Sequence, residues 1–285
     1  MDVGFAPTGV ERRQCMTKEK YALLDTDFIS KTHLIRKDDQ NKMIDRVMEL
    51  PEYRFYCHEQ IRTELARHDI GDSSEWLETK ISDGSVHCIS DEEIIDELHA
   101  IYSDSAEAMY ANMLRNGCEA YESGYFEKNF TRLWVLDYQS ILKDAFLQEL
   151  KADCDEIGEG NNLGELKSYV LLQTMSTKLG EQVYVFCSDD KNARSGIVSL
   201  GGARCISVLS AFMRLQNEGV LLKEDADPYL HAYLSECKKH NQTTFRVHDT
   251  SKQMRMCRVP CEQVIEEMYG GKLEVLQNGN LRYKQ

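Results

Sequence analysis

The sequence predicts an α/β fold with a mostly parallel sheet. Two short apolar runs, residues 21–24 and 183–187, each lead into acidic residues and then into a segment with helical spacing. A short apolar run of this kind is typical of a buried parallel strand. The carboxyl ends of parallel strands meet at one edge of the sheet, where open α/β sheets build their sites. We therefore expect carboxylates to gather at that edge.

Local patterns predict the elements that start the sheet. Asp25 or Thr26 suits the N-cap of a helix, because a short polar side chain can accept a hydrogen bond from the first turn. Pro51 should end a helix, because proline lacks the N–H that a helix interior needs. The elements expected up to residue 89 are strands at 21–24, 54–57 and 85–89 and helices at 25–35, 41–50 and 58–66.

A long helical segment should follow. Ser90-Asp91-Glu92-Glu93 is a capping-box pattern, and the helix that it starts should reach about residue 114. A second long helix is expected over 130–152, where apolar residues recur near helical spacing. We interpret most of residues 90–155 as a helical insertion beside the active edge of the sheet. The tyrosines of this insertion, Tyr121 among them, are expected to pack between helices rather than to stack on bases.

The remaining elements complete the main domain and add an appendage. A loop over 155–164 should precede helices at 164–178, 191–200, 210–217 and 227–239 and strands at 183–187 and 205–208. The last segment changes to alternating apolar residues with turn signals, typical of a small α+β unit with a terminal hairpin. The expected domains are a disordered lead-in at 1–17, a main domain at 18–240 and the C-terminal appendage at 241–285.

Composition indicates a soluble globular protein. Hydrophobic residues make up 42% and charged residues 29% of the chain. The sequence contains no stretch of 18 apolar residues, so no membrane span is predicted. The N-terminus lacks the apolar core of a signal peptide. The 10 cysteines are scattered and form no CxxC pair, so we expect reduced thiols in a cytoplasmic protein.

The charge is uneven along the chain. A net charge of −14 disfavours nonspecific binding of polyanions. From Cys237 to Gln285, however, there are nine Lys/Arg and five Asp/Glu residues. This tail is interpreted either as an ordinary solvated basic surface or as a contact surface for nucleic acid.

Two acidic pairs follow the predicted strands. Asp25 and Asp27 follow the first strand, and Asp189 and Asp190 follow the strand at 183–187. Either pair alone is explained by helix capping. Together they would place like charges at neighbouring strand ends, where they repel unless they share protons or bind a cation. Divalent cations that prefer oxygen ligands are the usual solution.

Two glutamates near the starts of predicted helices could lie at the same carboxyl edge of the sheet. Glu64 and Glu165 each belong to the first turns of a predicted helix, from which a side chain can be aimed back over the sheet edge. The alternative for Glu64 is a surface ion pair within its helix. The alternative for Glu165 is a first-turn acid favoured by the helix dipole.

These acidic segments resemble the PIN-domain nucleases, the PilT N-terminus family. The similar segments are, in order, LLDTDFIS, EQIRTELAR, NNLGELKS and VYVFCSDDKNAR, and GIVSLGGARCISVLSAFMRL resembles the closing glycine, strand and helix of that fold. The resemblance spans about residues 21–222. It implies a three-layer α/β/α sandwich that cleaves RNA, or less often DNA, with Mg²⁺ or Mn²⁺.

The resemblance also implies the catalytic and metal-binding carboxylates. Asp25 matches the first acid of the family and is the expected bridging metal ligand. Phosphodiester cleavage needs a deprotonated water and stabilisation of negative charge, and two divalent cations about 4 Å apart can provide both. The four catalytic residues so implied are Asp25, Glu64, Glu165 and Asp190.

Further residues complete the expected site. Asp27 stands where the family often has Asn, and Asp189 is an extra or alternative metal ligand. Thr26 should support the first acid by a hydrogen bond. On the substrate side, Thr26, Lys191 and Arg194 are the expected contacts, the last two with phosphates.

Two other functions are consistent with the same residues. Residues 25–27 and 188–190 also resemble the motifs of a haloacid-dehalogenase-like phosphatase with Asp25 as its nucleophile. Against it, Ile29 stands where that motif usually has Thr or Val, and the two glutamates would be unexplained. The other alternative is a non-catalytic PIN-like binding module. An RNA partner is expected, and a protein inhibitor such as an antitoxin and a homo-oligomer are left open.

Overall fold

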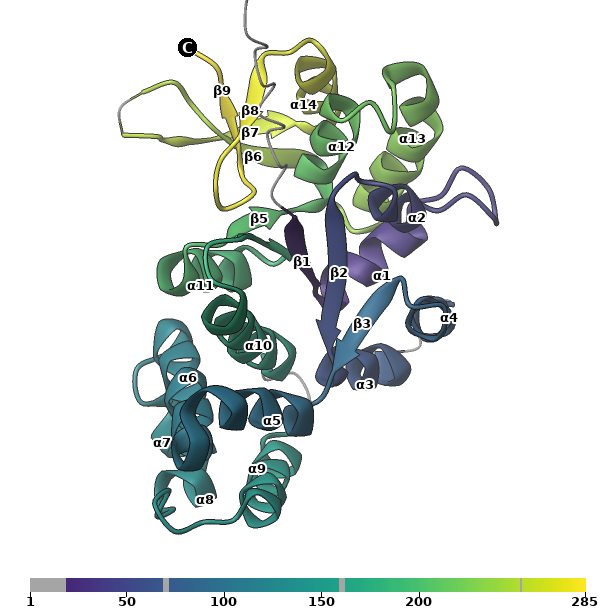
Figure 1. The fold of residues 1–285 in the computed structure, drawn as a ribbon. Coiled ribbons are helices and arrows are strands. Elements are labelled where there is room, and N and C mark those ends of the chain that lie inside the picture. The colour runs from purple at the N-terminus through teal and green to yellow at the C-terminus, as the bar shows by residue number, and fades with distance from the viewer. Residues whose placement is uncertain (1–18, 69–71, 159–161, 252) are drawn as a thin grey trace, which may run out of the picture.

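The computed structural model describes residues 19–68, 72–158, 162–251 and 253–285 (Figure 1). The main sheet has five parallel strands in the order β3-β2-β1-β4-β5. The predicted α/β class and parallel sheet are therefore confirmed. The expected lead-in at 1–17 lies outside the described residues. The strands are β1 (Lys20–Leu24), β2 (Tyr53–His58), β3 (Val86–Ile89), β4 (Val183–Cys187) and β5 (Arg204–Ile206).

The strand order brings the two acidic segments together. β2 lies on one side of β1, and β4, which comes much later in the chain, lies on the other. Leu24 at the end of β1 is level with Cys187 at the end of β4. The backbone N–H of Asp25 donates to the carbonyl oxygen of Cys187 at 3.0 Å. Ligands of open α/β sheets bind at the carboxyl edge where the strand order reverses, and β1 and β4 meet at that point.

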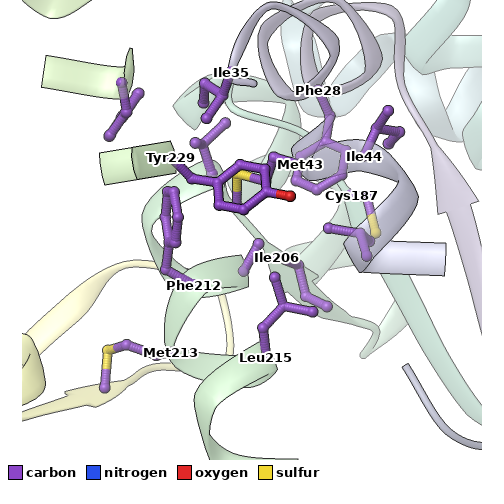
Figure 2. Packing of buried hydrophobic residues seen from close by; sticks show 14 of the residues in the cluster. Phe28, Ile35, Met43, Ile44, Cys187, Ile206, Phe212, Met213, Leu215 and Tyr229 are labelled. Carbon is purple, nitrogen blue, oxygen red and sulfur yellow. The ribbon is translucent and has the colours of Figure 1, made fainter. Parts of the chain in front are cut away.

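Helices cover both faces of the main sheet (Figure 1). Successive residues of a strand point to opposite faces, so Ala22 and Leu24 enter one core while Tyr21 and Leu23 enter the other. Figure 2 shows part of the first core, where side chains such as Phe28 from α1 and Tyr229 from α13 meet. The helices that supply the first core are α1 (Thr26–Leu34), α2 (Met43–Met48), α3 (Glu59–His68), α4 (Ser73–Ser82), α12 (Val208–Asn217) and α13 (Lys223–Lys239).

The second core is formed with the long helical segment between β3 and β4. The helices of this segment, with the one that follows β4, are α5 (Asp91–Tyr102), η1 (Ser103–Ser105), α6 (Ala106–Tyr121), α7 (Tyr125–Asn129), α8 (Thr131–Trp134), α9 (Lys143–Ile157), α10 (Leu163–Leu179) and α11 (Lys191–Gly201). Within the described part of the chain, no helix is both long and apolar enough to cross a bilayer.

The helical segment departs from its prediction in two places. The capping box of Ser90 and Glu93 is present, but its helix ends at Tyr102, and Ser103 has a positive φ of 52°. The single helix expected over 130–152 is wrong, because α8 and α9 are separated by a turn. In that turn the Asp137 carboxylate accepts hydrogen bonds from the N–H of Gln139 and the hydroxyl of Ser140. Local bonds of this kind compete with the helical hydrogen bonds.

The C-terminal segment forms a separate four-stranded sheet, in the order β7-β6-β9-β8. The turn between β8 and β9 docks on β5, where the N–H of Cys205 donates to the Gln277 carbonyl oxygen at 2.7 Å. Gly279 has a φ of 75°, and a Cβ there would lie 3.1 Å from the Cys205 carbonyl oxygen. Phe245 is buried in the first core of the main sheet. The elements are β6 (Thr244–His248), β7 (Met256–Pro260), α14 (Cys261–Tyr269), β8 (Leu273–Val275) and β9 (Leu281–Tyr283).

Candidate metal centre

The carboxylate of Asp25 lies at the centre of the site. Asp25 occupies the N-cap position of α1, but its side chain makes no capping hydrogen bond. It is 2% exposed, and its Oδ2 atom is buried with no hydrogen-bond partner in the described structure. Helix capping therefore does not explain this carboxylate. A buried oxygen without a partner is costly for the fold, which makes Asp25 a candidate for binding a ligand.

The surroundings of Asp25 favour its protonated form. Burial, and then the charge of Glu165, raise its pKa well above the usual range. The hydroxyl of Ser188 opposes this increase by hydrogen bonding, while the charges of Asp27 and Glu64 add to it. Acids from the end of β1, the middle of α3 and the start of α10 thus act on one another, as expected for carboxylates that await a cation.

Glu64 is held in place by donors from other segments. The hydroxyl of Thr26 donates to its Oε2 at 2.6 Å, and the N–H of Gly164 donates to its Oε1 at 3.0 Å. The amide of Gln60 adds a longer hydrogen bond of 3.3 Å. The expectation that Thr26 supports Asp25 is corrected, because the threonine hydroxyl supports Glu64 instead. The alternative of a surface ion pair for Glu64 fails for the same reason, since its partners lie across the site.

Gly164 permits the close approach of α10 to α3. A Cβ at this position would lie 2.7 Å from Oε2 of Glu64 and 2.9 Å from Cδ1 of Ile61. Both distances are shorter than real Cβ contacts. Because glycine has no side chain, the first turn of α10 can place its N–H against Glu64 and carry Glu165 into the site.

Glu165 is the second strongly perturbed acid. It lies in the first turn of α10 and is partly buried. Burial raises its pKa to about 7, and the charges of Glu64, Asp190 and Asp27 contribute in the same direction. A helix dipole alone would lower the pKa of a first-turn acid. The raised pKa therefore reflects burial first and the neighbouring carboxylates second.

Asp190 is both a helix cap and a member of the cluster. Its Oδ1 accepts hydrogen bonds from the N–H groups of Asn192 at 2.5 Å and Ala193 at 3.2 Å, so the capping interpretation holds for this residue. Its charge nevertheless acts on Glu165. The side chain is exposed at the rim of the site.

Lys31 pairs with the two remaining acids, Asp27 and Asp189. Its Nζ lies 2.9 Å from Oδ2 of Asp27 and 2.9 Å from Oδ2 of Asp189. The other oxygen of Asp189 accepts a hydrogen bond from the N–H of Val208 at 3.2 Å. A cation of the chain is thus already paired with both expected extra ligands. Sequence reasoning missed Lys31, although its spacing of four residues from Asp27 is that of an ion pair on one helix.

Tyr121 is a second residue that sequence reasoning missed. Its hydroxyl, at the end of α6, is buried with no hydrogen-bond partner in the described structure. Burial raises the pKa of Tyr121, and the charges of Glu165, Asp25 and Asp190 raise it further. The helical insertion therefore turns a hydroxyl toward the acids. Its spacing resembled that of other packing tyrosines, so the sequence contained no separate signal for it.

The two cationic side chains expected to contact the substrate, Lys191 and Arg194, have different environments. Lys191 is exposed at the start of α11 and makes no ion pair with the described residues. Arg194 is 5% exposed. Its guanidinium donates to the carbonyl oxygens of Ser188 at 2.8 Å and Asn278 at 2.9 Å and to Oδ1 of Asn280 at 3.1 Å. We assign Arg194 a structural role, because it ties the end of β4 to the C-terminal hairpin.

Among the described residues, one group offers three ligand atoms that all lie within 4.8 Å of one another, and it lies beside the insertion rather than in the acid cluster. His58, Glu59 and Asp91 could together surround an ion. Asp91, however, already binds the amine of Lys167 at 2.7 Å and Nε2 of His58 at 3.1 Å, and it also accepts a hydrogen bond from Tyr110. Lys167 is 1% exposed and supplies the positive charge that a metal would bring. Glu59 is exposed, and the other residues form a polar network that joins α5, α6 and α10 to β2.

The chemistry of the cluster fits a hard divalent cation. Asp25, Glu64, Glu165 and Asp190 offer only carboxylate oxygens, the ligands that Mg²⁺ and Mn²⁺ prefer. We compared the chain with protein-family models, with curated proteins and with solved structures, and none of them matches. The function is therefore argued from the residues of the site.

Proposed function

We propose that this protein is a metal-dependent endoribonuclease that hydrolyses phosphodiester bonds of single-stranded or structured RNA. The observation that carries the proposal is the buried, unpartnered oxygen of Asp25 among other acids at the switch point of the sheet. Among the described residues, none of the four clustered acids forms an ion pair, whereas Asp27 and Asp189 share Lys31. A cluster of this kind is stable at neutral pH when it binds cations.

Each residue has a distinct part in the proposed reaction. Bound Mg²⁺ or Mn²⁺ would lower the pKa of a coordinated water and stabilise charge on the phosphate. Asp25 would bridge the cations, and Glu165 and Asp190 would complete the ligands. Glu64, fixed by Thr26 and by the backbone of α10, would orient water or a ligand. Lys191 would meet a substrate phosphate from the rim.

The arrangement of the acids supports a PIN-like fold as the finer description of the architecture. The resemblance predicts one acid after each of two central strands and one on each of two flanking helices. Asp25 and Asp190 follow β1 and β4, and Glu64 and Glu165 lie on α3 and α10. Helices on both sheet faces are compatible with a three-layer sandwich.

The phosphatase alternative accounts for fewer of these residues. It would use Asp25 as the nucleophile and Asp27 as a nearby acid, but Asp27 is paired with Lys31. It also gives no role to Glu64 and Glu165, whose positions depend on the specific contacts of Thr26 and Gly164. A non-catalytic binding module would have no need for the unpartnered carboxylate of Asp25. RNA as partner, a cytoplasmic location, an inhibitor protein and a homo-oligomer stay predictions.

The direct test is cleavage of RNA by the purified full-length chain. We expect endonucleolytic products from a single-stranded RNA in Mg²⁺ or Mn²⁺, none in EDTA, and none with Asp25→Asn. Asp39→Asn is the matched control, because the Asp39 side chain is fully exposed and lies outside the site. If Asp25→Asn retained full metal-dependent cleavage, the assignment of this site would fail. Release of phosphate from a phosphomonoester through a phosphorylated Asp25 would favour the phosphatase instead.

A further inference from the structure

A polar groove lies between the carboxyl edge of β4 and the C-terminal sheet. It has a volume of about 460 Å³ and lies between α11 and the strands β6, β7 and β9. Asp189 and Lys191, the two neighbours of Asp190, both line it. The residues on either side of Asp190 therefore line the groove, although Asp190 itself does not. The size of the groove is in the range of ligand-binding pockets, roughly 300–1,000 Å³.

One face of the β6–β7 hairpin supplies the wall of the groove. Thr244 and Arg246 of β6 and Met256 and Arg258 of β7 line it. Of the alternate residues, Val247 and Val259 are buried in the core. The hairpin therefore has one face buried in the core and one face that lines the groove.

Arg246 and Arg258 face each other across the hairpin. They are directly opposite in the antiparallel register, and both are exposed. Like charges in this position destabilise a sheet. Neither guanidinium makes an ion pair or hydrogen bond with any described residue, in a chain whose net charge is −14. The fold thus keeps two repelling, unpaired arginines together at one wall of a groove.

The remaining lining matches a phosphate backbone. Asn241, Gln242 and Thr243 lie at the groove and offer amide and hydroxyl donors. Four cationic side chains and one carboxylate line it. Arg194 is already bound to backbone carbonyls and Asp189 is paired with Lys31, so the exposed cations are Lys191, Arg246 and Arg258. Arginines with neutral hydrogen-bond donors are the usual contacts of nucleic-acid phosphates and sugars. An acidic peptide would need the same charges but would make less use of the neutral donors.

We propose that this groove binds the phosphate backbone of single-stranded RNA next to the scissile bond, with Arg246 and Arg258 as its principal contacts. The proposal rests on the proposed nuclease function for its substrate. The C-terminal appendage would then position substrate, while the carboxylates at the edge of the main sheet carry out the reaction. Because the appendage shares the core of the main sheet, point substitutions rather than truncation are the proper test.

The test is binding of a labelled single-stranded RNA to full-length protein in EDTA, measured by fluorescence anisotropy over a series of salt concentrations. The Asp25→Asn background prevents cleavage. Arg246→Gln/Arg258→Gln should weaken binding and reduce the slope of log K against log salt by about 1.4, because each lost phosphate contact on a single strand removes about 0.7. The melting temperature should not fall, since the substitution relieves a repulsion.

The matched control is Lys223→Gln/Lys272→Gln, which removes the same charge from two exposed lysines outside the groove. If the arginine double variant had the affinity and salt slope of this control, the proposed RNA-binding role of the groove would be overturned, even if the wild-type protein cleaves RNA. If the arginine double variant had a reduced salt slope but the wild-type protein did not cleave RNA, the RNA-binding role of the groove would be supported and the nuclease function would be rejected. Displacement of the RNA by an equal concentration of polyglutamate would indicate an acidic protein partner and would also overturn the proposal.

Discussion

The hydroxyl of Thr26 donates a hydrogen bond to the carboxylate of Glu64 across 2.6 Å. This contact joins the residue after Asp25, at the start of α1, to the middle of α3. The same carboxylate accepts the backbone N–H of Gly164 at the start of α10. One glutamate therefore locks three segments that are far apart in the sequence, and it fixes the spacing of the acids before any ligand arrives. Preorganisation of this kind is what a metal site requires.

Metal binding should raise the stability of the protein. A ligand that binds only the folded state stabilises it by mass action, by about 2.7 kcal/mol at a hundred times its Kd. Mg²⁺ or Mn²⁺ should therefore increase the melting temperature by several degrees, and EDTA should reverse the increase. A melting temperature indifferent to both metal and chelator would contradict the metal centre and favour the binding module.

Replacement of Asp25 should separate metal binding from folding. Asp25→Asn removes an ionisation that burial and Glu165 disfavour, so the metal-free variant should be at least as stable as the wild type. The increase in melting temperature with metal should be lost. Differential scanning fluorimetry with and without Mn²⁺ measures both effects. Asp39→Asn should keep the metal response of the wild type.

Sequence patterns predicted the strands of the sheet well, but they predicted the roles of single side chains less well. The strand at 183–187 was predicted with its observed bounds, because a continuous apolar run is bounded by polar residues. Asp25 and Asp190 were indistinguishable in sequence, since each precedes a helix. Only the structure shows that Asp190 turns back to cap α11 while Asp25 does not. The helix over 130–152 failed because a single side chain, Asp137, stabilises a turn inside an otherwise helical pattern.

Gly164→Ala should weaken metal binding more than it weakens the fold. The new methyl would meet Glu64 at 2.7 Å and must displace it, at a typical cost of about 1–3 kcal/mol for overpacking. The better helix propensity of alanine offsets roughly 1 kcal/mol of that cost. Isothermal titration with Mn²⁺ and thermal unfolding measure the two effects.

The control for this substitution is Gly196→Ala in α11. Its Cβ would meet only Cε2 of Tyr121, at an ordinary 3.9 Å. This variant should bind metal as the wild type does. Equal metal affinity in the wild type and the Gly164 variant would show that the position of Glu64 is not needed for the site.

The acid cluster should make stability of the metal-free protein depend on pH. The pKa of Glu165 is raised from 4.5 to about 7 in the folded state. Between these values the folded protein holds a proton that the unfolded chain has lost, so stability falls as pH rises from about 4.5 to about 7. In EDTA, the fall in melting temperature over this range should be smaller for Glu165→Gln than for the wild type. Identical pH profiles of the two proteins would refute the raised pKa.

The buried pair of Asp91 and Lys167 should be the most sensitive polar contact outside the site. Asp91→Asn leaves the amine of Lys167, which is 1% exposed, without its counterion at 2.7 Å. Breaking a buried pair from one side costs about 3–5 kcal/mol, because an uncompensated charge remains buried. Replacing both partners, as in Asp91→Asn/Lys167→Met, removes that charge and should recover much of the loss.

Urea denaturation of the single and double variants, evaluated as a double-mutant cycle, measures this coupling. Asp39→Asn, on the exposed surface, should change stability by less than about 0.5 kcal/mol. A single Asp91 variant as stable as this control would mean that Lys167 finds another partner or loses its charge. A double variant as unstable as the single one would instead place the cost in the hydrogen bonds of His58 and Tyr110 to Asp91.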